Sequence, residues 1–77
     1  MPQDFCLPQL GMNMRQATVV AWLQPEGARL RRGEPLVQVE TDKAVEEIEA
    51  PSDGVLRRIL VAPGKKVAVG AALAVIE

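Results

Sequence analysis

Lys43 is the side chain in this 77-residue chain whose place in the sequence most clearly suggests chemistry. It lies in the tripeptide Asp42-Lys43-Ala44, between two runs that mix apolar and polar residues. Aspartate favours turns because its carboxylate accepts hydrogen bonds from nearby backbone amides. We therefore expect a hairpin with Asp42 and Lys43 at its tip, and the lysine ammonium in solvent.

A lysine at such a tip suits modification better than catalysis. A solvated ammonium stays protonated near neutral pH, which makes it a poor general base and a poor Schiff-base nucleophile. It can accept an activated acyl group if a second enzyme brings that group and takes up the proton. The sequence therefore predicts that Lys43 is a site of covalent modification.

Other reactive groups are few. The chain has one cysteine, Cys6, and no histidine, so we expect no internal disulfide, no metal site and no Cys/His catalytic pair. Cys6 is expected to be a small packing residue on the first strand. Gly27 and Gly33 are too far apart for a dinucleotide-binding loop. We expect no catalytic residues in this chain.

Charge is unevenly distributed although the formal net charge is only −1. Between residues 40 and 53 Lys43 is the one base, among six acids: Glu40, Asp42, Glu46, Glu47, Glu49 and Asp53. A negative field around Lys43 argues against nucleic acid there and favours a partner with a basic docking surface. Solvation of strand faces, which prevents edge-to-edge aggregation, explains part of the same pattern.

The chain's size and composition predict one small domain, residues 1–77, made of strands. Six glycines, six prolines and many Val, Leu, Ile and Ala residues favour short strands over helices. No run approaches the roughly 20 apolar residues of a membrane span, and the first residues resemble no secretion signal. We expect no membrane association, a monomeric domain and a reducing compartment such as the cytoplasm.

The sequence contains a near-repeat. Sliding the chain along itself until Leu23 falls on Leu60 also superposes Gly27 on Gly64 and Gly33 on Gly70. Apolar residues match at further positions, so residues 17–40 and 54–77 are predicted to be the two halves of a pseudo-two-fold domain, with the lysine hairpin, 41–50, between them. Each glycine is expected at a turn with positive φ or at a close backbone approach, Gly54 included.

Eight short strands are predicted, a number typical of a sandwich or flattened barrel. Alternation along the strand after the turn places Glu46 on the inward row, where it needs either water or a partner. Trp22 is expected at the core or its edge. The strand ranges expected are 4–8, 18–23, 28–31, 36–41, 44–50, 54–61, 66–67 and 71–76.

These residues resemble a known family. The segment Glu40-Thr41-Asp42-Lys43-Ala44, with the repeated glycine pattern around it, is similar to the lipoyl domain of 2-oxo acid dehydrogenase acyltransferases. The opening 7–14, followed by 18–23, resembles the start of pyruvate, acetoin and branched-chain acyltransferase subunits. The resemblance covers essentially the whole chain and implies a flattened β-barrel of two four-stranded antiparallel sheets, the barrel-sandwich hybrid.

The resemblance also implies a function. Lys43 would carry lipoate in amide linkage, attached by a lipoyl ligase or transferase. This arm would take an acyl group from the thiamine-diphosphate-dependent 2-oxo acid dehydrogenase, pass it to coenzyme A at the acyltransferase core, and be reoxidised by dihydrolipoamide dehydrogenase. The domain itself would not be an enzyme but the N-terminal part of an acyltransferase, in the bacterial cytoplasm or the mitochondrial matrix.

Site residues follow from the same resemblance. Glu40, Thr41, Asp42 and Ala44 would present Lys43 to the modifying enzyme. The loop Leu10, Gly11, Met12, Asn13 and Met14 would help the dehydrogenase to recognise the domain, although Met12 and Met14 could equally fill gaps in packing. The structural turns would be at Gly27, Gly33, Gly54, Gly64 and Gly70.

Two positions depart from the family pattern, and alternative functions stay open. Ala17 stands where glycine is common, as at its repeat partner Gly54, and a positive φ there would cost about 1 kcal/mol. Glu46 replaces what is often an apolar or small residue. A biotin carrier would share the fold, but such carriers look like Met-Lys-Met at the hairpin, where this chain has Asp42-Lys43-Ala44. A glycine-cleavage carrier is longer, and an unmodified interaction module needs no lysine at the tip.

Overall fold

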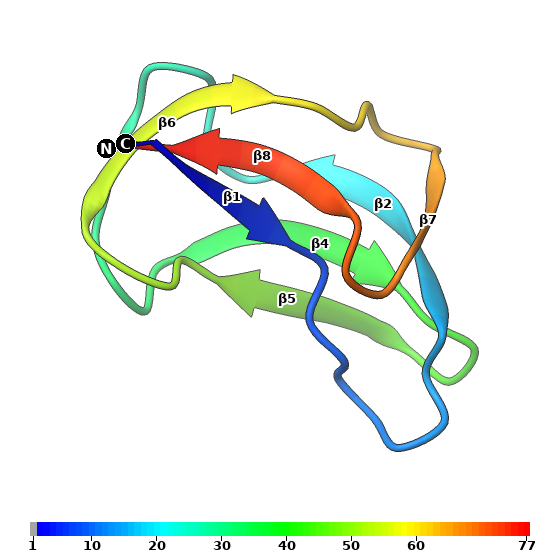
Figure 1. Ribbon diagram of the computed structural model, residues 1–77. Helices are drawn as coiled ribbons and strands as arrows, with labels where there is room; N and C mark the ends of the chain where they lie inside the picture. The colour runs from blue at the N-terminus through cyan, green and yellow to red at the C-terminus, as the bar shows by residue number, and fades with distance from the viewer. Residues whose placement is uncertain (1) are drawn as a thin grey trace.

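The computed structural model describes residues 2–77, which form two four-stranded antiparallel sheets. One sheet has the strand order β1-β8-β6-β3 and the other β5-β4-β2-β7, and the two lie face to face (Figure 1). The domain measures 31 × 21 × 18 Å. In chain order the strands are β1 Gln3–Cys6, β2 Gln16–Trp22, β3 Arg29–Leu30, β4 Pro35–Glu40, β5 Val45–Glu49, β6 Gly54–Ile59, β7 Lys66–Ala68 and β8 Ala72–Ile76.

The predicted all-β class and the two-sheet architecture are confirmed. Each expected strand is present, with ends that differ from the predicted ones by at most two residues. The described part of the chain has no helix of the length and apolarity that crossing a bilayer requires. The strands are short because glycine and proline recur between them, so the turns rather than strand length fix the architecture.

The two halves of the repeat exchange strands. The short strand β3 of the first half pairs with β6 of the second, and the short strand β7 of the second half pairs with β2 of the first. Neither half therefore completes a sheet without the other. Their inward faces share one core made of Phe5, Leu7, Ala17, Val19, Leu30, Leu36, Val37, Val39, Ile48, Ala50, Leu56, Leu73, Ala74 and Ile76.

Four glycines occupy the left-handed region at matched positions of the repeat. Gly27, Gly33, Gly64 and Gly70 have φ between 91° and 92°, where a side chain would be strained. In each half of the repeat these turns join corresponding strands. The repeated glycine spacing in the sequence is therefore a repeated backbone geometry.

Gly54 and Ala17, its repeat counterpart, behave differently from those four. The concern that Ala17 might need a positive φ was misplaced: it lies within β2 opposite Val67, is buried, and among residues 2–77 only glycines have positive φ. Gly54 begins β6 instead of lying in a turn, and a Cβ built on it would lie 2.8 Å from the Glu77 carbonyl oxygen. Gly54 is required by close approach.

β-Bulges let consecutive residues enter the core. The register of β4 against β5 shifts between Pro35 and Val37, and both Leu36 and Val37 are fully buried. Simple alternation would have put only one of them inside. Their repeat counterparts, Leu73 and Ala74 of β8, are buried in the same way.

Cys6 does not pack in the core as expected, whereas Trp22 lies at the edge of the core as expected. The register of β1 against β8 shifts after Phe5, and Cys6 is exposed between the buried side chains of Phe5 and Leu7, so it is not a packing residue. Trp22 is half-buried against the core, and its Nε1 donates a hydrogen bond to the Val61 carbonyl at 2.8 Å. The indole thus links the first half of the repeat to the second.

Replacing Gly54 by alanine should destabilise the domain by about 1–3 kcal/mol, because the added methyl group collides with backbone. It would also meet Ile76 Cγ2 at 3.1 Å. Urea unfolding of Gly54→Ala and wild type measures the loss. Gly11→Ala is the control, since a Cβ at Gly11 meets nothing within 4 Å. Equal stability of the two variants would contradict the close-approach explanation.

Candidate functional site

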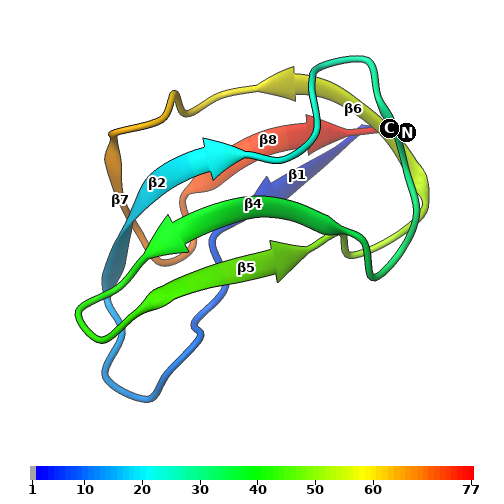
Figure 2. The same cartoon turned by 180° about the vertical axis from the view of Figure 1, so that it is seen from behind.

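Lys43 lies at the tip of the hairpin that joins β4 to β5. The N- and C-termini lie together at the opposite end of the domain, as both views show (Figures 1 and 2). The loop between β1 and β2 extends at the same end as the lysine hairpin. The lysine tip and this loop therefore form one surface, well separated from the chain ends.

Thr41 holds the hairpin turn together. The Thr41 amide donates to the Ala44 carbonyl at 2.8 Å, which closes the hairpin. The Thr41 hydroxyl donates to the same carbonyl at 3.0 Å and accepts hydrogen bonds from the amides of Lys43 and Ala44, each at 3.3 Å. The backbone on both sides of the lysine side chain is thus tied to one threonine.

This stabilising role was predicted for Asp42, and that prediction was wrong. Within residues 2–77 the carboxylate of Asp42 takes no part in the hydrogen bonds of the turn, and Asp42 is exposed. A hydroxyl two residues before Lys43 can cap a turn as aspartate does, so Thr41 was the available signal. Neither Asp42 nor Lys43 has a positive φ, so the turn needs no glycine.

The Lys43 side chain is exposed, and its neighbours Asp42 and Ala44 are exposed too. Within residues 2–77 the ion pair that forms is Arg57–Glu77, at 3.3 Å, near the termini. The Lys43 ammonium is thus paired with no carboxylate of the described chain, although Glu40 is exposed three residues away.

A groove lies between the lysine hairpin and the loop that joins β1 to β2. Its volume is about 600 Å³, within the range of roughly 300–1,000 Å³ typical of small-molecule sites. Lys43 itself lines it, so whatever is attached to the amine starts at the groove. The lining residues are Leu10, Gly11, Met12, Asn13, Met14, Arg15, Gln16, Thr41, Asp42, Lys43 and Glu46.

The two methionines of the loop differ in role. Met14 is half-buried against the core, and its sulfur accepts a hydrogen bond from the Leu10 amide at 3.3 Å. Met12 is 95% exposed. Of the two interpretations left open by the sequence, gap filling describes Met14, whereas the exposure of Met12 excludes gap filling there.

Glu46 reaches water at the end of the inward row. It is paired with the buried Val39 across the strands, yet it is exposed, whereas Ile48 on the same row of β5 is buried. Its carboxylate lines the groove beside Lys43. Of the two outcomes expected for Glu46 on the inward row, water or a partner, the structure shows water, and the position of its carboxylate in the groove was not predicted.

The outer side of the same hairpin is acidic. Glu40, Glu47 and Glu49 are exposed on β4 and β5, and Glu47 accepts a hydrogen bond from Gln38 Nε2 at 3.3 Å. No base of the described residues forms an ion pair with them. Lys43 is the one base on this hairpin, so converting its amine to an amide removes the local positive charge.

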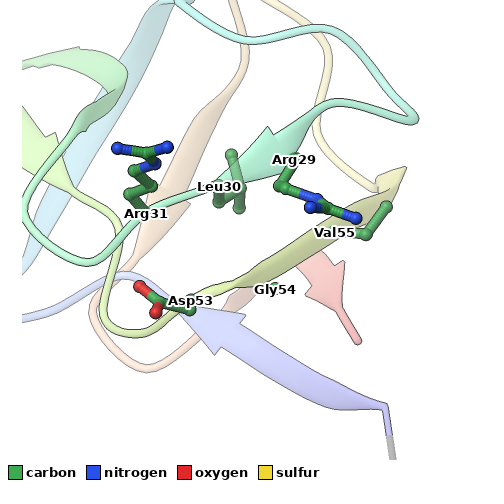
Figure 3. A pocket seen from close by; sticks show the side chains of 6 residues that line it. All are labelled: Arg29, Leu30, Arg31, Asp53, Gly54 and Val55. Atoms are coloured by element: carbon green, nitrogen blue, oxygen red, sulfur yellow. The ribbon is translucent and has the colours of Figure 1, made fainter.

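A second hollow, of about 430 Å³, lies near the termini. Figure 3 shows the guanidinium groups of Arg29 and Arg31 on either side of Leu30, with Asp53 below. The Asp53 carboxylate accepts a hydrogen bond from the Arg32 amide at 2.8 Å and so serves the turn. Across residues 2–77 no three His, Cys, Asp or Glu side chains gather as a metal site would require.

Comparison with known proteins identifies relatives of the whole domain. The family model described as "Biotin-requiring enzyme", a model of biotin and lipoyl domains, matches residues 3–76. The dihydrolipoyllysine-residue acetyltransferase component of the acetoin cleaving system of Pseudomonas putida is 43% identical over 91% of this chain and 19% of its own length. The mitochondrial pyruvate dehydrogenase complex protein X component of Chaetomium thermophilum is 39% identical over 96% of this chain and 17% of its own.

A solved structure gives the same answer. The lipoyl domain of the 2-oxoglutarate dehydrogenase complex from Azotobacter vinelandii superposes with a TM-score of 0.77 at 32% identity, covering 96% of this chain and 94% of that one. The chain spans less than a fifth of the length of the two relatives named above. Its sequence, its two sheets and its lysine hairpin together show that this chain belongs to the biotin/lipoyl attachment domain family.

Proposed function

We propose that Lys43 is lipoylated and that the domain carries the resulting arm within a 2-oxo acid dehydrogenase complex. The observation that carries this proposal is the exposed, unpaired Lys43 amine on a turn fixed by Thr41. A rigid turn holds the Lys43 backbone in one place, which lowers the entropy lost when a modifying enzyme engages the hairpin.

The residues present suit an amide-linked group. A ligase would supply an activated lipoyl group, the Lys43 nitrogen would form the amide as the activating group leaves, and two of the three ammonium protons would pass to the ligase or to solvent. Attached lipoate supplies a dithiolane that can accept an acyl group and electrons. Glu40, Thr41, Asp42 and Ala44 shape the surface that the ligase meets, and the acidic strands β4 and β5 favour a partner with a basic surface.

Lipoate is favoured over biotin by the residues beside the lysine. Asp42 and Ala44 flank Lys43, whereas the sequence analysis associates Met-Lys-Met with biotin carriers. The relatives from Pseudomonas putida and Azotobacter vinelandii carry lipoyl in their names. An unmodified interaction module has no use for an unpaired lysine at the tip.

The remaining roles belong to the complex around the domain. We assign the charging of the arm to a thiamine-diphosphate-dependent dehydrogenase, acyl transfer to coenzyme A to an acyltransferase core, and reoxidation to dihydrolipoamide dehydrogenase. The loop Leu10–Met14, beside Lys43, is the proposed recognition element for the dehydrogenase. The domain itself supplies no catalysis, and we place it in the bacterial cytoplasm or the mitochondrial matrix.

Intact mass after co-expression with a lipoyl ligase, a biotin ligase and both acids tests the modification. We expect a lipoyl-sized increment on the wild-type chain and none on Lys43→Arg, because the guanidinium is far less nucleophilic. Lys66→Arg is the control and should keep the increment, since Lys66 lies on β7 and outside the hairpin. A biotin-sized increment would establish the rival carrier function instead.

Thr41→Val should slow lipoylation and destabilise the hairpin by about 1 kcal/mol, because it removes the hydroxyl that bonds the amides of Lys43 and Ala44. Initial rates of the mass increment at limiting ligase measure the first effect, and urea unfolding the second. Thr18→Val is the matched control, as Thr18 lies on β2 opposite Glu40 and its hydroxyl takes no part in the hydrogen bonds of the turn. Equal rates for both variants would show that the hydroxyl does not organise the acceptor.

A further inference from the structure

We propose that the groove between the β1–β2 loop and the lysine hairpin is a resting site for the lipoyl arm on Lys43, with Met12 and Met14 on one side and Glu46 on the other. This inference rests on the proposed function. It assigns to the groove a task between encounters with other proteins, in addition to any role of the loop in recognition.

The loop side of the groove has a fixed shape. The Gln9 side-chain amide donates to the carbonyls of Met12 at 3.0 Å and Met14 at 3.3 Å. The Met14 amide donates to the Gly11 carbonyl at 3.1 Å, and the Leu10 amide to the Met14 sulfur at 3.3 Å. These bonds hold the loop before any ligand arrives, so binding there orders little further backbone.

The apolar side chains of the loop, Leu10, Met12 and Met14, suit a sulfur-containing apolar arm, whereas polar and charged residues such as Arg15 and Asp42 line the rest of the groove. Leu10 is 42% exposed and Met12 is 95% exposed, so both offer apolar surface that the domain itself does not cover. Methionine sulfur is polarisable and adapts its shape to its neighbour. A short alkyl chain that ends in a dithiolane would cover these side chains and gain their burial.

Attachment at Lys43 makes a weak site effective. Because Lys43 lines the groove, the arm is tethered where it would bind. Short flexible tethers give effective concentrations on the order of millimolar, so a site with a dissociation constant in that range is occupied about half of the time. Such an arm is sheltered yet remains available to partners.

Glu46 limits how tightly the arm rests. Its carboxylate is exposed and lines the groove, and an apolar arm lying against it would strip water from a charge at a cost in free energy. The arm is therefore held less tightly than in an apolar groove, which favours release. Glu47, the next residue, carries the same charge but is paired with Gln38 on the outer face, and it supplies a matched control.

Methionine-methyl NMR tests the proposal on domain shown by mass to be lipoylated. With 13C-methyl methionine only Met1, Met12 and Met14 give signals. We expect Met12 and Met14 methyl shifts that differ from those of Lys43→Gln, a neutral side chain without the arm, and NOEs to the dithiolane protons. Glu46→Leu should strengthen these NOEs, whereas Glu47→Leu should leave them unchanged.

The rate at which a water-soluble phosphine reduces the dithiolane gives an independent measurement. A site occupied about half of the time should slow reduction about twofold relative to free lipoamide. Met12→Ser should restore the faster rate without unfolding the domain, because Met12 is 95% exposed. Glu46→Leu should slow reduction further.

Three outcomes would overturn the resting site. A lipoylated domain with no arm NOEs and a free-lipoamide reduction rate leaves the carrier function intact and removes this inference alone. Methionine shifts that appear only on addition of the dehydrogenase component would assign the groove to that protein instead. Absence of a lipoyl increment would remove both the carrier function and the resting site.

Discussion

Reciprocal exchange of short strands between the two halves of the repeat is the constraint on which the structure depends. A chain of 77 residues buries little apolar surface, so neither half could be stable with an open inner face. β3 completes the sheet of the second half and β7 that of the first, and the two sheets then share one core. The tip of the lysine hairpin can be polar, exposed and acidic because the hairpin, 41–50, contributes to this core only through Ile48 and Ala50, at the far end of β5 from the tip.

The fold was largely predictable because its determinants are periodic. Repeated glycines, frequent prolines and β-branched residues indicated eight strands in two halves, and the left-handed φ of Gly27 and Gly64 explains that spacing. The bulges were not predictable, since a bulge buries two neighbours and so breaks the alternation from which burial is inferred. Because of the bulges, the burial of both Leu36 and Val37 and the exposure of Cys6 were not foreseen.

The candidate site, like the fold, could be predicted only in part from the sequence. Lys43 could be predicted from its type and its place between strands, because only local geometry is needed to expose a turn residue. The role of Thr41 depends on the orientation of a hydroxyl, and the groove on how the β1–β2 loop meets the hairpin across the fold. Contacts between segments distant in sequence carry no local signal. The roles of Glu46 and Gln9 at the groove could therefore be recognised only from the three-dimensional structure.

The position of both chain ends, together and opposite Lys43, has a mechanical consequence. Any polypeptide joined to either end leaves the domain on the side away from the lysine hairpin. The domain, 31 Å in its longest dimension, then separates that polypeptide from the flexible Lys43 side chain. If the domain turned about such a joint, the amine would move farther than its own side chain allows, so the barrel would add to the reach of whatever Lys43 carries.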